Sequence, residues 1–222
     1  KSVASCSNHN RPKKEQFQTM KKPETRIQQR NRAAIMSAGL EIFSQFGLRG
    51  STLDKIAETA GLSKPNLLYY FPSKDAIYTA LLERLLETWL DPLLKMDPQG
   101  DPIQEILGYV RRKLAMSRDF PRESRLFANE ILQGAPHIAE HLNKDLRTLV
   151  AEKAVLIKEW EAAGKIAPVD PYHLIFSIWS TTQHYADFDV QVRAVLGGVD
   201  PTDGAMNYLD TLFRRMLTPP KA

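Results

Sequence analysis

One stretch of the chain carries an aromatic ring, an amide and a carboxylate at equal spacing within a segment of helical pattern. These are Trp179, Gln183 and Asp187. Residues four apart on an α-helix drift by only about 40° per step, so the three side chains share one face. An indole offers a stacking surface to a flat ring, an amide offers a donor and an acceptor, and a carboxylate accepts from a ligand N–H. The spacing favours a site for a small, flat, polar molecule; alternatively, Trp179 belongs to the core and the polar groups face solvent.

Three further residues could contribute to the same site. Trp89 lies in a long helical segment and is either a second wall of the site or an ordinary core tryptophan. Arg125 and Asn129 are again four apart on a predicted helix and could add polar contacts. Arg125 could equally pair with Glu130 or Asp119 at the surface. We expect no cofactor at this site.

A second group of polar and aromatic residues follows a tight turn between two short predicted helices. In this turn, residues 60–63, Gly61 permits the sharp bend and Leu62 fills its inside. In the helix that follows, Leu67 and Phe71 are four apart and face inward. This layout is typical of a helix-turn-helix, whose second helix enters the major groove of DNA.

The residues that this helix leaves exposed suit a DNA surface. Lys64 can donate to guanine, Asn66 can pair with adenine, and Pro65 can touch a thymine methyl group. The other candidates for base or phosphate contacts are Thr52, Tyr69, Tyr70 and Lys74. Alternatively, the two tyrosines are partly buried aromatic residues and the lysine at 74 is simply solvated.

The pattern of residues that must position these side chains is helical almost throughout. From residue 28 onward, apolar residues recur at spacings of three and four. Asp101-Pro102 and Asp170-Pro171 each place a capping acid before a proline at the first helical position. We expect an all-α fold with helices near residues 30–46, 53–60, 64–71, 74–95, 102–118, 121–133, 136–163, 171–195 and 202–217.

The charge of the chain is concentrated at its N-terminal end. The 222 residues have a formal net charge of +4, yet residues 1–32 contain 9 basic and 2 acidic side chains. A basic arm on a neutral or acidic body suggests a polyanion partner, although it could also be a solvated tail. We divide the chain into a basic flexible arm (1–29), a helix-turn-helix DNA-binding domain (30–76) and a helical effector-binding and dimerisation domain (77–222).

Several other classes of protein fit the sequence poorly. The single cysteine, Cys6, provides neither an internal disulfide nor a metal-ligand spacing. Charges interrupt the apolar segment 76–94, so we expect a cytoplasmic protein that does not span a membrane. No catalytic triad or glycine-rich phosphate loop occurs, and His137 and His141, although four apart, lack an obvious third metal ligand. We expect neither an enzyme nor a metal site.

The last two predicted helices, 171–195 and 202–217, carry apolar stripes. A helical hairpin with a surplus apolar face usually pairs with its own copy across a two-fold axis. We expect a homodimer with a four-helix interface, and the stripes that would form it contain Ile175, Ile178, Leu209, Leu212, Phe213 and Leu217.

The helix-turn-helix segment resembles the DNA-binding domain of TetR-type transcriptional repressors. The residues that carry the resemblance are Phe43, Gly47, Thr52, Ile56, Ala57, the turn 60–63, residues 67–71 and Lys74. The resemblance implies a dimer whose two recognition helices enter successive major grooves of palindromic operator DNA, in the bacterial nucleoid. It also implies that the seven candidates named above contact bases or phosphates. Tyr70 stands where many members have His, and Leu68 where many have Tyr, so the operator sequence does not follow from it.

The C-terminal part is similar to a narrower group, the pyrimidine-utilisation regulators of enteric bacteria. The segments that carry this similarity are 174–188, 67–74 and 124–127. It implies that uracil or thymine is the effector and that its binding weakens the hold on the operators of pyrimidine-metabolism genes. Within the same fold, the alternative is a repressor of efflux or stress genes that senses a larger hydrophobic ligand in a roomy pocket without the polar set on the Trp179 helix.

The charge of the arm leads to a test. If residues 1–29 contact phosphates or the minor groove beside the operator, their deletion reduces the number of counterions released on binding. We expect the slope of log affinity against log salt to become shallower in the deleted protein, measured by fluorescence anisotropy over a salt series. An unchanged slope would rule out phosphate contacts by the arm.

Overall fold

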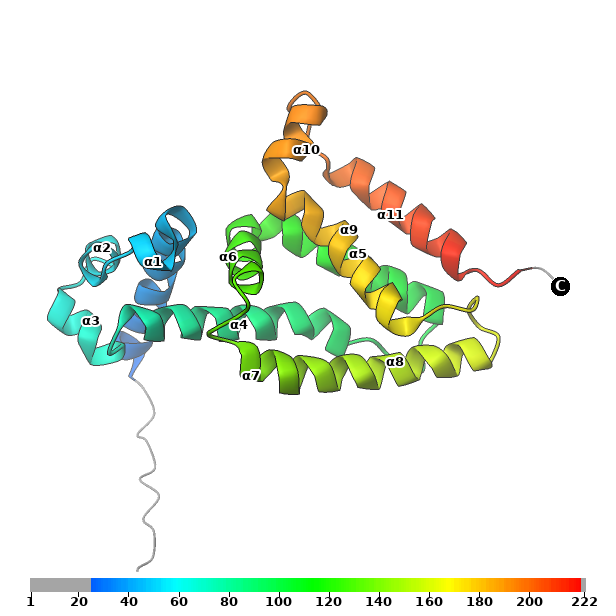
Figure 1. Cartoon of the computed structure of the whole chain (residues 1–222), viewed down its shortest axis with the longest axis horizontal. Helices are drawn as coiled ribbons and strands as arrows, with labels where there is room; N and C mark the ends of the chain where they lie inside the picture. Colours follow the sequence, from blue (N-terminus) through cyan, green and yellow to red (C-terminus); the bar gives the residue numbers. More distant parts are fainter. Residues whose placement is uncertain (1–24, 221–222) are drawn as a thin grey trace, which may run out of the picture.

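The computed structural model describes residues 25–220, and all regular secondary structure in this range is helical (Figure 1). The all-α prediction is confirmed. No helix in the described range is long and apolar enough to span a bilayer. In chain order the elements are α1 (Arg26–Gly50), α2 (Leu53–Thr59), α3 (Lys64–Tyr70), α4 (Lys74–Leu94), α5 (Pro102–Asp119), α6 (Pro121–Leu132), α7 (Ala139–His141), the π-helical turn η1 (Leu142–Leu146), α8 (Arg147–Ala162), α9 (Pro171–Asp187), α10 (Asp189–Val195) and α11 (Thr202–Leu217).

Side-chain caps start most of the longer helices. Asp101 accepts a hydrogen bond from the backbone N–H of Gln104 (2.8 Å), and Asp170 accepts one from that of His173 (2.9 Å). The hydroxyl of Ser73 caps α4 in the same way. Each cap satisfies a backbone donor that the first turn of a helix leaves free, so both Asp-Pro pairs begin helices as the sequence predicts.

The first helix begins earlier than the sequence analysis expected. Thr25 and Gln28 form a reciprocal capping box, and α1 therefore starts at Arg26. The expected boundary at residue 29 thus falls inside α1. The rest of the proposed arm, residues 1–24, lies outside the described residues. A deletion that spares α1 must end at residue 24.

Two later helices also differ from the expected ranges. The helix expected from residue 136 begins at Ala139, because Gly134 and Ala135 both take positive φ values (88° and 55°) and Pro136 follows them. The helix expected over 171–195 is interrupted at Phe188 (φ −114°, ψ 28°), which separates α9 from the short α10. The break redirects the chain beyond residue 188, as Figure 1 shows.

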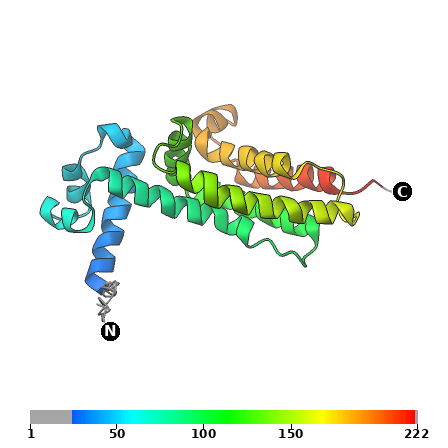
Figure 2. The same ribbon diagram turned by 60° about the horizontal axis from the view of Figure 1, so that its bottom comes forward.

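The long helix α4 belongs to two hydrophobic cores. Its N-terminal half packs with α1, α2 and α3, where Ile77 and Leu82 are fully buried. Its C-terminal end, with Leu93, packs into the core formed with α5, α8, α9 and α11. Figures 1 and 2 show α4 running from the small N-terminal helices into the larger helical body. Gly39 allows the close approach of α1, because a Cβ atom there would lie 2.8 Å from the side chain of Ile77.

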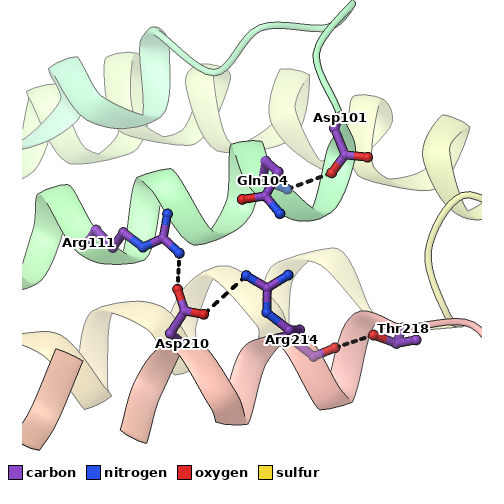
Figure 3. A network of polar contacts seen from close by, with 6 residues as sticks. All are labelled: Asp101, Gln104, Arg111, Asp210, Arg214 and Thr218. Carbon is purple, nitrogen blue, oxygen red and sulfur yellow. Dashed lines mark hydrogen bonds and ion pairs between the residues drawn. The ribbon is translucent and has the colours of Figure 1, made fainter. Parts of the chain in front are cut away.

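A charged cluster ties α11 to α5. Arg111 and Arg214 both donate to the carboxylate of Asp210, the latter at 3.2 Å (Figure 3). Although burial opposes it, the hydrogen bonds and charges of the two guanidinium groups hold the pKa of Asp210 below its usual value. The carboxylate therefore stays ionised at neutral pH and accepts hydrogen bonds from a guanidinium group of each helix.

The dimer stripes expected from the sequence are mostly internal. Five of the six residues belong to the core of the single chain; only Leu212 is exposed. The reason is that α9 and α11 need one apolar side each to pack on α5 and α8, and periodicity alone cannot tell this side from a second one. Both helices also leave large apolar side chains exposed, which we call together the α9–α11 face: Tyr172, Phe176, Tyr208, Leu212 and Met216.

Candidate functional site

The turn between α2 and α3 has the geometry that its glycine predicts. Gly61 takes a φ of 67°, a conformation that residues with a side chain rarely adopt. Beside it, the N–H of Leu62 bonds to the carbonyl of Ala57 at 2.9 Å. Ile56 of α2 and Leu67 of α3 are both fully buried in the same hydrophobic core. The two short helices are thereby held as a compact helix-turn-helix.

The first turn of α3 presents its polar residues to solvent. Lys64, Pro65 and Asn66 are exposed, as is Thr52 at the N-cap of α2. Without DNA, the ammonium group of Lys64 pairs with Asp54 at 2.9 Å. Because both side chains are well exposed, this ion pair contributes little and a base or phosphate can replace it.

The two tyrosines at the end of α3 bond to α1. The side-chain amides of Gln28 and Asn31 donate to the hydroxyls of Tyr69 (3.2 Å) and Tyr70 (3.1 Å), and the two rings meet edge to face. Tyr69 is 70% exposed, whereas Tyr70 is half-buried. Each hydroxyl accepts from an amide and so keeps its own O–H to donate to a phosphate. The amides of α1, which the sequence analysis missed, therefore orient both rings.

Lys74 lies in a different environment from the other candidates. Its ammonium group donates to the carbonyls of Leu48 (2.8 Å) and Ser51 (3.0 Å), at the C-terminal end of α1. A cation at this position satisfies carbonyls that the end of the helix leaves free. Lys74 is thus not a freely solvated lysine, because it fastens the start of α4 to the end of α1.

A cavity of about 650 Å³ lies between α4, α5, α6, η1 and α9. All six candidate effector residues line this one cavity, namely Trp89, Arg125, Asn129, Trp179, Gln183 and Asp187. The remaining wall is mostly apolar and includes Leu86, Leu90, Leu142, Leu146, Ile131, Leu132 and Phe127. The structure thus brings the predicted residues together from three helices, although Asn129 is exposed.

The polar groups of the cavity gather around one carboxylate. Asp187 accepts a hydrogen bond from the buried Ser124 of α6 at 2.6 Å. Arg125, also on α6, donates to the backbone carbonyl of Ala186 at 3.3 Å. Burial raises the pKa of Asp187, against the opposing effects of Ser124, Arg125 and Lys113. Arg125 is therefore a neighbour of Asp187, not of Glu130 or Asp119.

The aromatic residues of the cavity are fixed by their neighbours. The indole N–H of Trp179 donates to the hydroxyl of Tyr109 on α5 at 2.6 Å, so only the ring faces and edges of this indole remain for a ligand. Trp89 packs against Phe127 with ring centroids 5.1 Å apart. Two walls of the cavity are therefore rigid apolar surfaces on which a flat ring can lie.

One lining residue of importance, Lys113 on α5, was missed by the sequence analysis. Lys113 is only 3% exposed, and its ammonium group lies 5.8 Å from the ring centre of Trp89. The signal was present: Lys113 falls three and four residues after Val110 and Tyr109, on the buried face of the helix. A lysine on such a face is either paired or functional.

The histidine pair His137 and His141 belongs to two separate networks. His137 donates its backbone N–H to the buried carboxylate of Glu130 at 2.7 Å, while His141 contacts Glu83 of α4 and Asp145. Across residues 25–220, no three His, Cys, Asp or Glu side chains group closely enough to hold a metal ion.

The fold and its two sites define a class of protein: a helix-turn-helix regulator in which a ligand cavity is joined to a DNA-binding surface. The chain belongs to the TetR family. Residues 35–81 match the profile of the bacterial regulatory proteins of the tetR family, and residues 82–219 match the C-terminal region of YcdC-like proteins. The chain is accordingly a DNA-binding transcriptional regulator and not an enzyme.

Individual relatives agree with this assignment. The HTH-type transcriptional regulator RutR of Escherichia coli strain K12 is 54% identical over 164 residues, which cover 74% of this chain and 77% of that protein. The transcriptional regulator SCO4942 of Streptomyces coelicolor has a similar structure, with a TM-score of 0.68, 25% identity, and coverage of 86% and 99% of the two chains. AibR, in complex with isovaleryl coenzyme A and operator DNA, shares the fold at 14% identity, with a TM-score of 0.64 and coverage of 86% and 100%.

The exposed first turn of α3 gives a test of base recognition. We expect Asn66→Ala to weaken binding to an operator selected from random DNA by the wild-type protein by about 1–3 kcal/mol, because a bidentate contact to adenine is lost. Binding to unrelated DNA should not change, and Asn143→Ala, an exposed asparagine outside α1–α3, is the control. Electrophoretic mobility shifts measure all three proteins. Equal operator affinities for the wild type and Asn66→Ala would remove Asn66 from the set of base contacts.

Proposed function

We propose that this protein is a homodimeric regulator of pyrimidine-metabolism genes, and that uracil or thymine releases it from a palindromic operator. The observation that carries the proposal is the cavity itself, which combines the indole of Trp179, the amide of Gln183 and the carboxylate of Asp187. A flat ring with carbonyl and N–H groups matches a stacking plate beside a donor and acceptors. The 54% identity to RutR supports the same assignment. Acting on chromosomal DNA, the protein would work in the cytoplasm.

The DNA-binding surface in this proposal is the exposed side of α3 together with the N-terminus of α2. Lys64, Pro65 and Asn66 face the bases, and the hydroxyls of Tyr69 and Tyr70 bind phosphates. Thr52 adds a hydroxyl at the N-terminus of a helix, where backbone N–H groups and the helix dipole favour an anion. Lys74 acts in this surface by holding α4 against α1.

Helix α4 is the proposed link between the cavity and DNA. Trp89 lines the cavity, while Ile77, three turns earlier on the same helix, packs against Gly39 of α1. A shift of α4 that improves contacts to the ligand therefore moves the helix-turn-helix as well. The ligand can change DNA affinity only as far as it binds the two arrangements differently.

Helix α6 offers a second, shorter route. It carries Arg125 into the cavity, and one turn later its buried Glu130 lies beside Tyr78 of α4. Burial, together with the charge of Glu130, raises the pKa of Tyr78 above its usual value, so its hydroxyl keeps its proton. Tyr78 in turn packs edge to face on Phe43 of α1 at 5.1 Å. The path from the cavity to α1 thus runs along α6 to Glu130 and then through the side chains of Tyr78 and Phe43.

The size of the cavity favours a second candidate. A volume of about 650 Å³ is that of a site for a drug-sized molecule and is much larger than one pyrimidine ring. A repressor of efflux or stress genes that senses a larger hydrophobic ligand would use the leucine-lined side of the cavity. The polar cluster around Asp187 has no use in that function, which is why the pyrimidine assignment is preferred.

The α9–α11 face supports the homodimer and can be tested. A second copy would cover the exposed Tyr172, Phe176, Tyr208, Leu212 and Met216, which a monomer leaves in water. We expect Leu212→Glu to shift the protein from dimer to monomer in sedimentation velocity, because it buries a charge at this interface. Val155→Glu, at an exposed valine on α8, is the matched control. A wild-type monomer, or a dimer that survives Leu212→Glu, would contradict this interface.

The effector is tested by calorimetric titration. We expect uracil to bind the wild-type protein with micromolar affinity and cytosine to bind much more weakly. Gln183→Ala should lose at least about tenfold in affinity for uracil, because one hydrogen bond inside a desolvated site is removed. Gln191→Ala, an exposed glutamine on α10, is the control. No heat with uracil or thymine would leave the DNA-binding function standing and direct the search to larger hydrophobic ligands.

A further inference from the structure

The cavity is lined by a cationic side chain, Lys113, that is 3% exposed and receives no hydrogen-bond acceptor from the described residues. Within residues 25–220, no hydrogen bond from the ammonium of Lys113 to a protein acceptor is present, and the ammonium lies over the ring of Trp89, 5.8 Å from its centre. The residue lines the cavity wall and lies on the buried face of α5. An ammonium that faces a mostly apolar cavity is poorly solvated, so a ligand that supplies an acceptor gains more there than at a lysine in open water.

Lys113 shares one carboxylate with a second cation. Arg125 and Lys113 are the cationic side chains that line the cavity, and the charges of both act on Asp187. One oxygen of Asp187 accepts from Ser124, whereas the other has no donor among the described residues. Two cationic donors, Lys113 of α5 and Arg125 of α6, and one acceptor, the carboxylate of Asp187 on α9, therefore border the same end of the cavity.

We infer that Lys113 is a specificity-determining residue of the cavity, which donates to a ligand carbonyl and, with Asp187 and Arg125, selects the edge of a cyclic imide. Such an edge presents a carbonyl, an N–H and a second carbonyl in a row. It matches two cationic donors with a carboxylate acceptor between them. The same edge of cytosine presents a carbonyl, an unprotonated nitrogen and an amino group, which leaves one cation and the carboxylate facing groups of the wrong kind. This inference rests on the proposed function, in that it places the effector in this cavity.

The charge of Lys113 gives the recognition a pH dependence. Burial lowers the pKa of Lys113 to about 8, against a smaller opposing effect of Asp187. The charged groups that face it are Asp187 of α9 and Arg125 of α6, while α4 contributes the neutral indole of Trp89. A ligand carbonyl favours the ammonium form, so affinity should be full below pH 8 and fall as the pH rises above it. At pH 9 about one-tenth of the free protein carries the proton, which predicts a loss of about tenfold.

The experiment is a calorimetric titration of three ligands into three proteins. The ligands are uracil, glutarimide (a cyclic imide that is not a pyrimidine) and cytosine. The proteins are the wild type, Lys113→Met and Lys165→Met, the last at an exposed lysine outside the cavity. We expect Lys113→Met to weaken both imides by about tenfold to a hundredfold, to abolish the pH dependence and to leave the weak binding of cytosine unchanged. Lys165→Met should behave as the wild type.

Thermal unfolding distinguishes a role in recognition from a structural one. Because Lys113→Met removes a buried charge without an acceptor, the unliganded variant should unfold at the same or a higher temperature than the wild type. Unchanged imide affinity in a folded Lys113→Met protein, or wild-type affinity that does not vary between pH 7 and pH 9, would overturn the inference. So would a wild-type protein that binds neither imide.

The outcomes also separate this inference from the proposed function. If glutarimide binds in a manner that depends on Lys113 but uracil does not bind, the role of Lys113 in selecting a cyclic imide stands and the assignment of a pyrimidine effector fails. If uracil binds, is lost in Gln183→Ala and is unaffected by Lys113→Met, the proposed function stands and the role of Lys113 is rejected.

Discussion

The structure depends on the fact that one continuous helix, α4, is packed in two hydrophobic cores. Its first half is buried among α1–α3 and its end among α5, α8, α9 and α11. Interiors at this density have discrete packing arrangements and do not deform smoothly, so a displacement at one end of the helix must be accommodated at the other. Trp89 lies on the same helix and borders the cavity. The packing of α4 that stabilises the fold is therefore the same packing that would transmit a ligand-induced shift to α1–α3.

The fold and much of the candidate sites could be predicted because they depend on local rules. Caps such as Asp101 and Asp170 and the left-handed glycine at 61 follow from backbone hydrogen bonding and sterics within a few residues. The same holds for the shared face of Trp179, Gln183 and Asp187, since a helix of known phase fixes the direction of every side chain on it. What the spacing could not decide is whether that face points to solvent or to a cavity. The structure shows that these residues meet Trp89 and Arg125 there.

The features that were missed depend on contacts between segments distant in the sequence. Gln28 and Asn31 orient the tyrosines of α3 across about forty positions, and Lys74 bonds to the end of α1. No pattern in the neighbouring sequence marks these residues as partners. The prediction from the stripes of α9 and α11 failed for a related reason: both helices carry apolar residues on more than one side, and the pattern does not say which side is inside. Lys113 is the exception, since its position on a buried helical face was visible in the sequence.

The polar end of the cavity shows how burial and sensitivity are connected here. Burial disfavours the charged forms of both Lys113 and Asp187, so neither group is fully solvated in the empty protein. A ligand that satisfies both groups gains free energy from them in addition to its other contacts, and it does so only in the arrangement of α5, α6 and α9 that brings them together. In the proposed function, the affinity for the ligand therefore differs between packing arrangements. That difference is the quantity a regulator needs, because an effector that bound all arrangements equally would leave the DNA-binding helices where they were.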